Sequence, residues 1–261
     1  MNWNRIFGII VRYWYSWRHN LDRLTDSFYW PAMDLLLWGL TSLYIKNTST
    51  DFPQIVLVLI SGLIFWMVIW KSQYEITTNL LQEIWDKNLV NIFAAPLTIA
   101  EWVGAVMIMG VIKVVITISF ASLLAFFLYA FNIFIYGIFI LPFFFSLVLT
   151  GWAAGFVVAG LIMRYGFRIQ ALAWAGVYIL APFSAIYFPV SLLPIWAQKI
   201  AAIVPSSYIF EGMREVLFTG QLSFDKLIIS IALNLIYLVL SIMFFVYMYN
   251  KSRTFGLGRL I

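Results

Sequence analysis

The sequence predicts an all-α integral membrane protein with six transmembrane helices, and three observations lead to this fold class. Hydrophobic residues make up 64% of the chain and charged residues only 10%, whereas soluble domains carry about 25% charged residues. The mean hydropathy is +0.95, which also excludes a disordered chain. We expect residues 1–261 to form a single transmembrane domain. Its apolar runs, near or above the length of about 20 residues that a span needs, lie at 28–45, 54–72, 102–131, 134–163, 170–188 and 227–249.

The composition also excludes several classes of function. The absence of cysteine rules out disulfides and thiol catalysis, and a single histidine, His19, argues against a histidine metal site. The chain has no Walker-type phosphate loop and no HExxH or GxSxG motif. We therefore expect no enzyme activity and no bound cofactor in this chain. Its net charge of +5 comes from basic residues near span ends and not from one stripe, so we expect no nucleic-acid partner.

The first 26 residues predict an amphipathic helix with a basic face. Apolar and aromatic residues recur at helical spacing from Trp3 to Trp17, while Arg5, Arg12 and Arg23 fall on the opposite side. Such a helix lies in the membrane plane. The alternative is an ordinary segment before the first span, anchored at the interface by its tryptophans.

The distribution of lysine and arginine predicts that both termini are cytoplasmic. With the N-terminus inside, eleven basic residues fall on cytoplasmic segments and four on external ones, as the positive-inside rule requires. The cytoplasmic set is Arg5, Arg12, Arg18, Arg23, Lys71, Lys87, Arg164, Arg168, Lys251, Arg253 and Arg259, and the external set is Lys46, Lys199, Arg214 and Lys226. We expect the chain in the cell membrane (the inner or plasma membrane).

Two segments between spans are too patterned to be simple connections. Residues 76–93 predict a cytoplasmic helix with one apolar face, and Pro96 ends it before the third span. Residues 189–220 are predicted to be external, and Pro194 and Pro205 divide them into runs that are too short to span. We expect two short re-entrant helices there, packed against protein.

Four charged residues are candidates for function because ionisable groups inside a membrane are costly. Asp34 lies in the first span and Lys113 in the third. They either form a pair or face a substrate path, or else Asp34 sits in the headgroup zone and Lys113 snorkels. Glu211 and Arg214 are spaced i, i+3 on an external helix. They are either a surface ion pair or part of a gate.

In order and spacing, these features resemble the permease subunits of type-2 ATP-binding-cassette (ABC) transporters. A basic amphipathic helix precedes two spans and a cytoplasmic helix, and WDKNLVNIFAAPLTIAEW is similar to the family's segment before its third span. The most specific match is FPVSLLPIW…IVPSSYIFEGMREVL before the last span. The resemblance covers essentially the whole chain.

The resemblance implies a mechanism and partners. Two permease subunits, either two copies of this chain or this chain with a homologue, would surround a central path in contact with membrane lipids. Two cytoplasmic ATPase subunits would bind ATP and Mg beneath them. The residues implied to contact the ATPase are Glu83, Trp85, Asp86 and Lys87, and those implied to form the external gate are Pro194, Pro205, Glu211 and Arg214.

Cargo in the family includes drugs, lipids and lipid-linked glycans. The N-terminal segment is nearer the drug and lipid branch, although abundant Trp and Tyr would serve sugar stacking equally well. A second hypothesis is an ion-coupled secondary transporter that works without ATP, which predicts inverted repeats and broken helices. A third is a membrane enzyme or assembly factor, which the absence of catalytic clusters disfavours.

Overall fold

The computed structural model describes residues 1–48 and 55–254, and these residues form helices and no β-strand. Four helical stretches are long and apolar enough to cross a membrane: Val56–Trp85, Ile99–Tyr129, Ile133–Ile169 and Phe224–Thr254. They coincide with the second, third, fourth and sixth predicted spans. The prediction of an all-α membrane protein is confirmed at this level.

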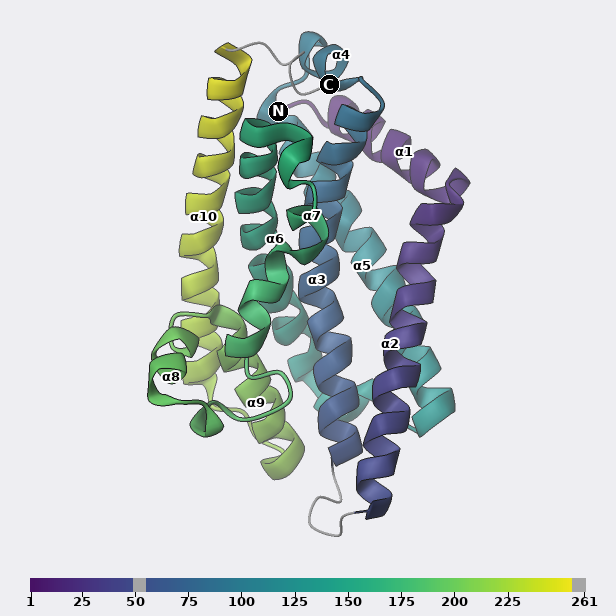
Figure 1. Ribbon diagram of the computed structural model, residues 1–261, viewed down its shortest axis with the longest axis vertical. Coiled ribbons are helices and arrows are strands. Elements are labelled where there is room, and N and C mark those ends of the chain that lie inside the picture. The colour runs from purple at the N-terminus through teal and green to yellow at the C-terminus, as the bar shows by residue number, and fades with distance from the viewer. Residues whose placement is uncertain (49–54, 255–261) are drawn as a thin grey trace.

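The helices form one elongated bundle. In chain order they are α1 (Trp3–His19), α2 (Leu21–Thr48), α3 (Ile55–Trp85), α4 (Leu89–Ala94), α5 (Ile99–Tyr129), η1 (Ile133–Phe139), α6 (Ile140–Tyr165), η2 (Gly166–Ile169), α7 (Leu172–Ala175), η3 (Gly176–Phe183), η4 (Val190–Leu192), α8 (Ile195–Ala201), α9 (Pro205–Thr219) and α10 (Phe224–Thr254). Helix α1 and the end of α10 lie at the same end of the bundle, together with α4, whereas α8 and α9 lie toward the other end (Figure 1). We call the first the α1 end and the second the α9 end.

The first and fifth predicted spans differ from the other four. Helix α2 is 28 residues long, but Asp34 and several Trp and Tyr residues lower its hydropathy, and it does not qualify as a span by composition. The run 170–188 does not form one helix. It is divided into α7 and the 3₁₀ helix η3, which ends after Pro182, because proline lacks the N–H that a longer helix would need.

The segment 76–93 is not a separate helix, contrary to the sequence-based prediction. Helix α3 continues without a break from Ile55 to Trp85, because the sequence has neither glycine nor proline between Gly62 and Trp85. The chain then turns at Lys87, whose φ is +52°, and the short helix α4 begins at Leu89. The predicted cytoplasmic helix is therefore the end of α3, a tight turn and α4.

The amphipathic helix is also shorter than its predicted range of 1–26. Helix α1 ends at His19, and the Asn20 side chain accepts hydrogen bonds from the backbone N–H groups of Asp22 and Arg23 (3.0 and 3.4 Å). Asparagine is a favoured N-cap residue because its side chain satisfies such free donors. Residues 21–26 accordingly form the first turns of α2.

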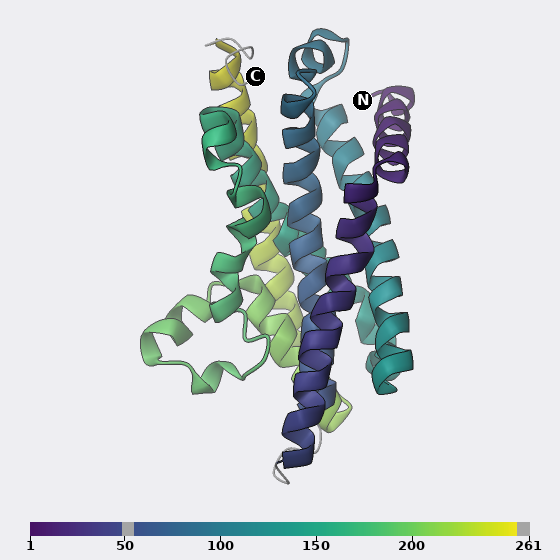
Figure 2. The same cartoon turned by 45° about the vertical axis from the view of Figure 1, so that its right-hand side comes forward.

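Three short helices occupy the stretch 189–220: the 3₁₀ helix η4, α8 and α9. Pro194 precedes α8, Pro205 is the first residue of α9, and Gly220 ends α9 with a φ of +73°. Figure 2 shows the segment that carries α8 standing away from the long helices.

The core of the bundle is built around α6, which packs most extensively against α10 and α3. Glycines allow the close approach of α6 to α3. A Cβ atom on Gly151 would lie 2.5 Å from the Ile69 carbonyl oxygen and 2.5 Å from the Ser72 Cβ. Small residues at such contacts let helix backbones approach closely in membranes.

We predict that Gly151→Ala destabilises the bundle by about 1–3 kcal/mol, because the added methyl group must push α6 away from the α3 backbone. The thermal unfolding midpoint of the detergent-purified protein measures the effect. Gly110→Ala on α5 is the matched control, because its Cβ would meet the nearest atom at 3.6 Å, an ordinary contact. Equal midpoints for the two variants would contradict this account of the packing.

Candidate functional site

A buried ion cluster joins α3 to α5 within the bundle. Lys71 and Glu75 are spaced i, i+4 on α3, and their charged groups lie 3.2 Å apart. The Lys113 ammonium on α5 donates to the other Glu75 carboxylate oxygen at 2.6 Å. All three side chains are 1–3% exposed. Two positive charges therefore share one negative charge inside the bundle, where buried ionisable groups persist only with partners.

Polar residues from α2 surround this cluster. The Lys71 ammonium donates to the Ser27 hydroxyl at 3.3 Å, and the Tyr74 hydroxyl donates to Asp26. A cavity of about 300 Å³ lies beside these groups and is also lined by Asn20, Trp85 and Trp174. The cavity is thus lined by acidic, basic and aromatic side chains from α1, α2, α3, α5 and α7.

The ion cluster identifies the partner of Lys113, one of the two charged residues expected inside the membrane. Lys113 has a buried carboxylate partner and does not snorkel. Asp34 is not that partner, and it lies half-buried on α2. Sequence reasoning missed Glu75 because it placed that residue in a loop. The sequence does contain a pattern that indicates Glu75. No glycine or proline interrupts the stretch from Gly62 to Trp85, and in a continuous helix Lys71 and Glu75 are neighbours at i, i+4.

Helix α1 is fastened to the ends of α3 and α5. The Arg12 guanidinium donates to the Glu83 carboxylate at 2.7 Å, and the Asn88 side chain donates to the same oxygen at 2.9 Å. The backbone N–H of Asn2 donates to Glu101 at 2.7 Å. Trp102 on α5 donates to the hydroxyl of Tyr13, whose pKa is raised by burial. These contacts fix α1 against the turn that follows α3.

The four residues expected to contact an ATPase fall into two groups. Glu83 is only 1% exposed, and its carboxylate bonds to Arg12 and Asn88, so it positions the turn and does not face a partner. Trp85 is 41% exposed and stacks on Trp174 with ring centroids 6.2 Å apart. Asp86 and Lys87 are exposed at the turn. Trp85, Asp86 and Lys87 therefore form an accessible surface at the α1 end.

At the α9 end, Glu211 and Arg214 hold a neighbouring segment in place. Arg214 donates to Glu211 at 2.9 Å and to the Ala185 carbonyl at 2.6 Å. Glu211 also accepts from the backbone N–H of Val190 at 2.8 Å. The pair therefore connects α9 to residues 185–190 and is more than an ion pair within one helix.

The two prolines named with that pair shape the short helices. Pro194 is the N-cap of α8, and Pro205 begins α9, where a missing N–H costs nothing. The Pro205 carbonyl accepts from Ser230 of α10 at 2.8 Å. Farther along α9, Glu215 accepts from the hydroxyl of Ser223 and from Lys226, and both interactions hold the pKa of this carboxyl below its usual range. Helix α9 is thus tied to α10 at two points.

Pairs of aromatic side chains lie along the side of α3 that faces α2, α7 and η3. Trp66 packs edge-on against Tyr178, and the Trp70 indole donates to the Trp174 carbonyl at 3.2 Å. Trp38 of α2 stacks on Tyr187 with ring centroids 5.3 Å apart. Together with the Trp85–Trp174 stack, these pairs run from the α1 end toward the α9 end. Trp66 is buried at 5% exposure, whereas Trp85 is 41% exposed, so the pairs differ in how accessible their rings are.

We predict that Glu75→Gln destabilises the protein by about 3–5 kcal/mol, because it removes the carboxylate that both buried lysines contact. The double variant Glu75→Gln, Lys113→Met should regain part of this loss, because it also removes one of the two uncompensated charges. Thermal unfolding midpoints of the detergent-purified variants test both statements. A Glu75→Gln midpoint equal to that of the unchanged chain would show that the cluster contributes nothing to stability.

Among the described residues, no group of three or more acidic, histidine or cysteine side chains is placed to hold a metal ion. No protein-family model matches the sequence, and no curated protein matches it either.

Proposed function

We propose that this chain is the membrane permease subunit of a type-2 ABC exporter. In this proposal six passes cross the membrane: α2, α3, α5, α6, the α7–η3 segment and α10. The chain forms the path and catalyses no reaction, while separate ATPase subunits bind ATP and Mg. The main support for the proposal is the surface at the α1 end. There Arg12 of the amphipathic helix α1 and Asn88, which precedes α4, both donate to Glu83 of α3 beside the exposed turn.

This surface is suited to transmit a force into the bundle. Arg12 and Asn88 both bond to Glu83, so a push on the turn at Asp86–Asn88 moves α1 and α3 together. Helix α5 follows because its first turn is bonded to Asn2 through Glu101. A partner that binds differently to two arrangements of these helices shifts the equilibrium between them. ATP-dependent closure of an ATPase dimer would be such an input.

The orientation in the proposal places the α1 end in the cytoplasm of the cell, as the basic residues predict. Both ends of the described chain lie there (Figure 1), which agrees with an even number of spans. Helices α8 and α9 then lie on the external side, and the Glu211–Arg214 pair closes the exit by holding residues 185–190. Pro194 and Pro205 set where these two helices begin.

The cargo in this proposal is a drug, a lipid or a lipid-linked glycan. The aromatic pairs along α2, α3 and η3 support an amphiphilic or sugar-bearing molecule, because aromatic faces accept both apolar chains and sugar rings. The exporter works as a dimer of two copies or of this chain with a homologous permease, so that this face of each protomer borders the path.

One observation favours a second candidate, an ion-coupled secondary transporter. The Lys71–Glu75–Lys113 cluster is a set of buried ionisable groups of the kind that carry protons or ions in such proteins. Transport that persists without ATP and collapses with the ion gradient would establish this alternative. Transport that requires ATP hydrolysis by a partner would exclude it.

The proposal is tested by purifying the chain together with the ATPase encoded by the neighbouring reading frame and measuring ATP hydrolysis in liposomes. Asp86→Lys and Trp85→Ala should weaken association by about tenfold each, because exposed anchors of this kind dominate interfaces. Asp225→Lys, an equally exposed carboxylate at the start of α10, is the matched control at the α9 end. If association and coupled hydrolysis are unchanged by the first two, the α1 end is not the ATPase surface.

A separate prediction concerns the external pair. Glu211→Gln should lower transport without lowering association with the ATPase, because it removes a charged hydrogen bond of about 1.5–3 kcal/mol that holds residues 185–190. Transport of a fluorescent lipid or drug into inverted vesicles measures the effect. Glu215→Gln on the same helix is the control, because Glu215 bonds to Ser223 and Lys226 and not to that segment. Normal transport by Glu211→Gln would make the pair a scaffold.

A further inference from the structure

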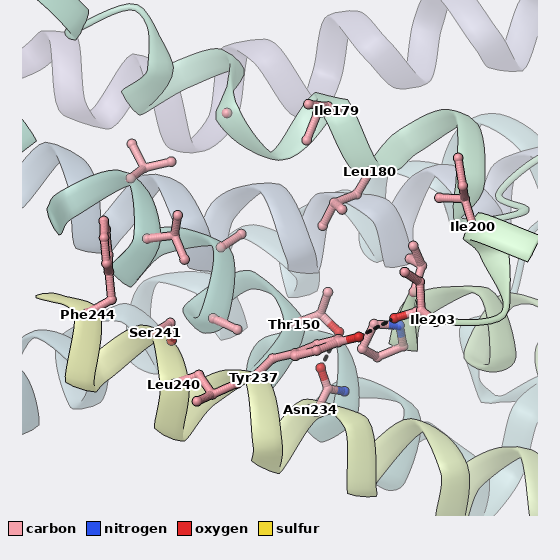
Figure 3. Close-up of a pocket in the computed structure, with 17 residues that line it drawn as sticks. Thr150, Ile179, Leu180, Ile200, Ile203, Asn234, Tyr237, Leu240, Ser241 and Phe244 are labelled. Carbon is pink, nitrogen blue, oxygen red and sulfur yellow. Dashed lines mark hydrogen bonds between the residues drawn. The ribbon is translucent and has the colours of Figure 1, made fainter. Parts of the chain in front are cut away.

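An apolar groove of about 640 Å³ lies between α6, η3, α10 and the end of α8 (Figure 3). Its walls carry Val157 and Ala154 from α6, Leu240 and Phe244 from α10, and Ile203 after α8. None of its lining residues is charged. The volume lies within the range of about 300–1,000 Å³ that is typical of ligand sites.

The polar atoms that line the groove already have partners within the protein. Asn234 accepts from Thr150 at 2.8 Å and donates to the Ser146 carbonyl at 2.9 Å. The Tyr237 hydroxyl donates to the Ile203 carbonyl at 2.9 Å. Figure 3 shows this bond and the bond between Thr150 and Asn234. Ser241 donates to the Leu238 carbonyl. The donors of these side chains are therefore used within the protein, and the remaining lining side chains are apolar.

The surroundings of the groove are hydrocarbon. Both α6 and α10 belong to stretches that are long and apolar enough to span the membrane, and the lining residues lie in their central turns. The exposed side chains beside the groove, such as Val157 and Leu240, are themselves apolar. An apolar chain from the bilayer is therefore the occupant that this surface favours.

Helix α8 gives the groove one polar neighbour. Lys199 precedes the lining residue Ile200 and is exposed, and Trp196 on the same helix is 62% exposed. Lysine and tryptophan are the usual anchors at the membrane interface, and a lysine there attracts a lipid phosphate. We propose that the groove binds an acyl chain of a membrane phospholipid, with its phosphate beside Lys199. This inference requires only that α6 and α10 cross the membrane, and it stands with or without an ATPase partner.

The test uses the full chain in vesicles of phosphatidylethanolamine and phosphatidylglycerol with a trace of phospholipid that carries a diazirine on its acyl chain. After irradiation, mass spectrometry locates the adducts. We expect them to concentrate on groove residues of α6 and α10. Val157→Phe should lower adduct formation at the groove by about tenfold, because the added ring fills the space of the chain. Leu240→Phe fills it from the opposite wall if the first variant fails to fold.

Val115→Phe on α5 is the matched control, because Val115 is 46% exposed and Val157 is 42% exposed, yet Val115 lies outside the groove. Lys199→Gln should lower groove labelling by the phospholipid but not by a diazirine fatty alcohol, and Lys46→Gln should change neither. Equal labelling of α5 and the groove would overturn the proposal in favour of ordinary surrounding lipid. Loss of dimers in Val157→Phe without groove labelling would overturn it in favour of a second protein chain.

Discussion

The buried contact of Glu75 with Lys71 and Lys113 is the constraint around which the first half of the bundle is arranged. A charge in an apolar interior is tolerated only when it is paired, so α3 and α5 must keep the register that brings Lys113 to 2.6 Å from Glu75. Lys71 extends the constraint to α2 through Ser27. The three helices that support α1 are thereby held in one arrangement.

Helix α3 connects the two ends of the molecule because it contacts the candidate residues at both. Glu83, near its last turn, bonds to Arg12 and to the turn before α4. Gly62, near its first turns, lies against the Ile186 carbonyl oxygen, which a Cβ would approach to 2.8 Å. That segment is the one held by Arg214. Helix α3 therefore has hydrogen-bonded or close backbone contacts near both of its ends.

Local patterns sufficed for much of the fold but not for its contacts. Pro96, Pro194, Pro205 and Gly220 mark helix ends correctly, because these residues act on their own backbone. The prediction of a separate helix over residues 76–93 was wrong. A polar segment after an apolar run is typical of a break between helices, but here α3 continues through the segment to Trp85. The partner of Lys113 lies 38 residues away in the chain, and a periodicity argument says nothing about which helices are neighbours.

The sequence alone predicted an all-α membrane protein, the places of the four helices that are long and apolar enough to span a membrane, and the cost of a charge at Lys113. Hydropathy and backbone chemistry are local properties, so they can be evaluated one window at a time. The tertiary structure decided that Glu75 is that partner, that Glu83 is buried and not exposed, and that α6, η3, α8 and α10 enclose an apolar groove. These outcomes depend on which helix faces pack together, which is a property of the whole chain.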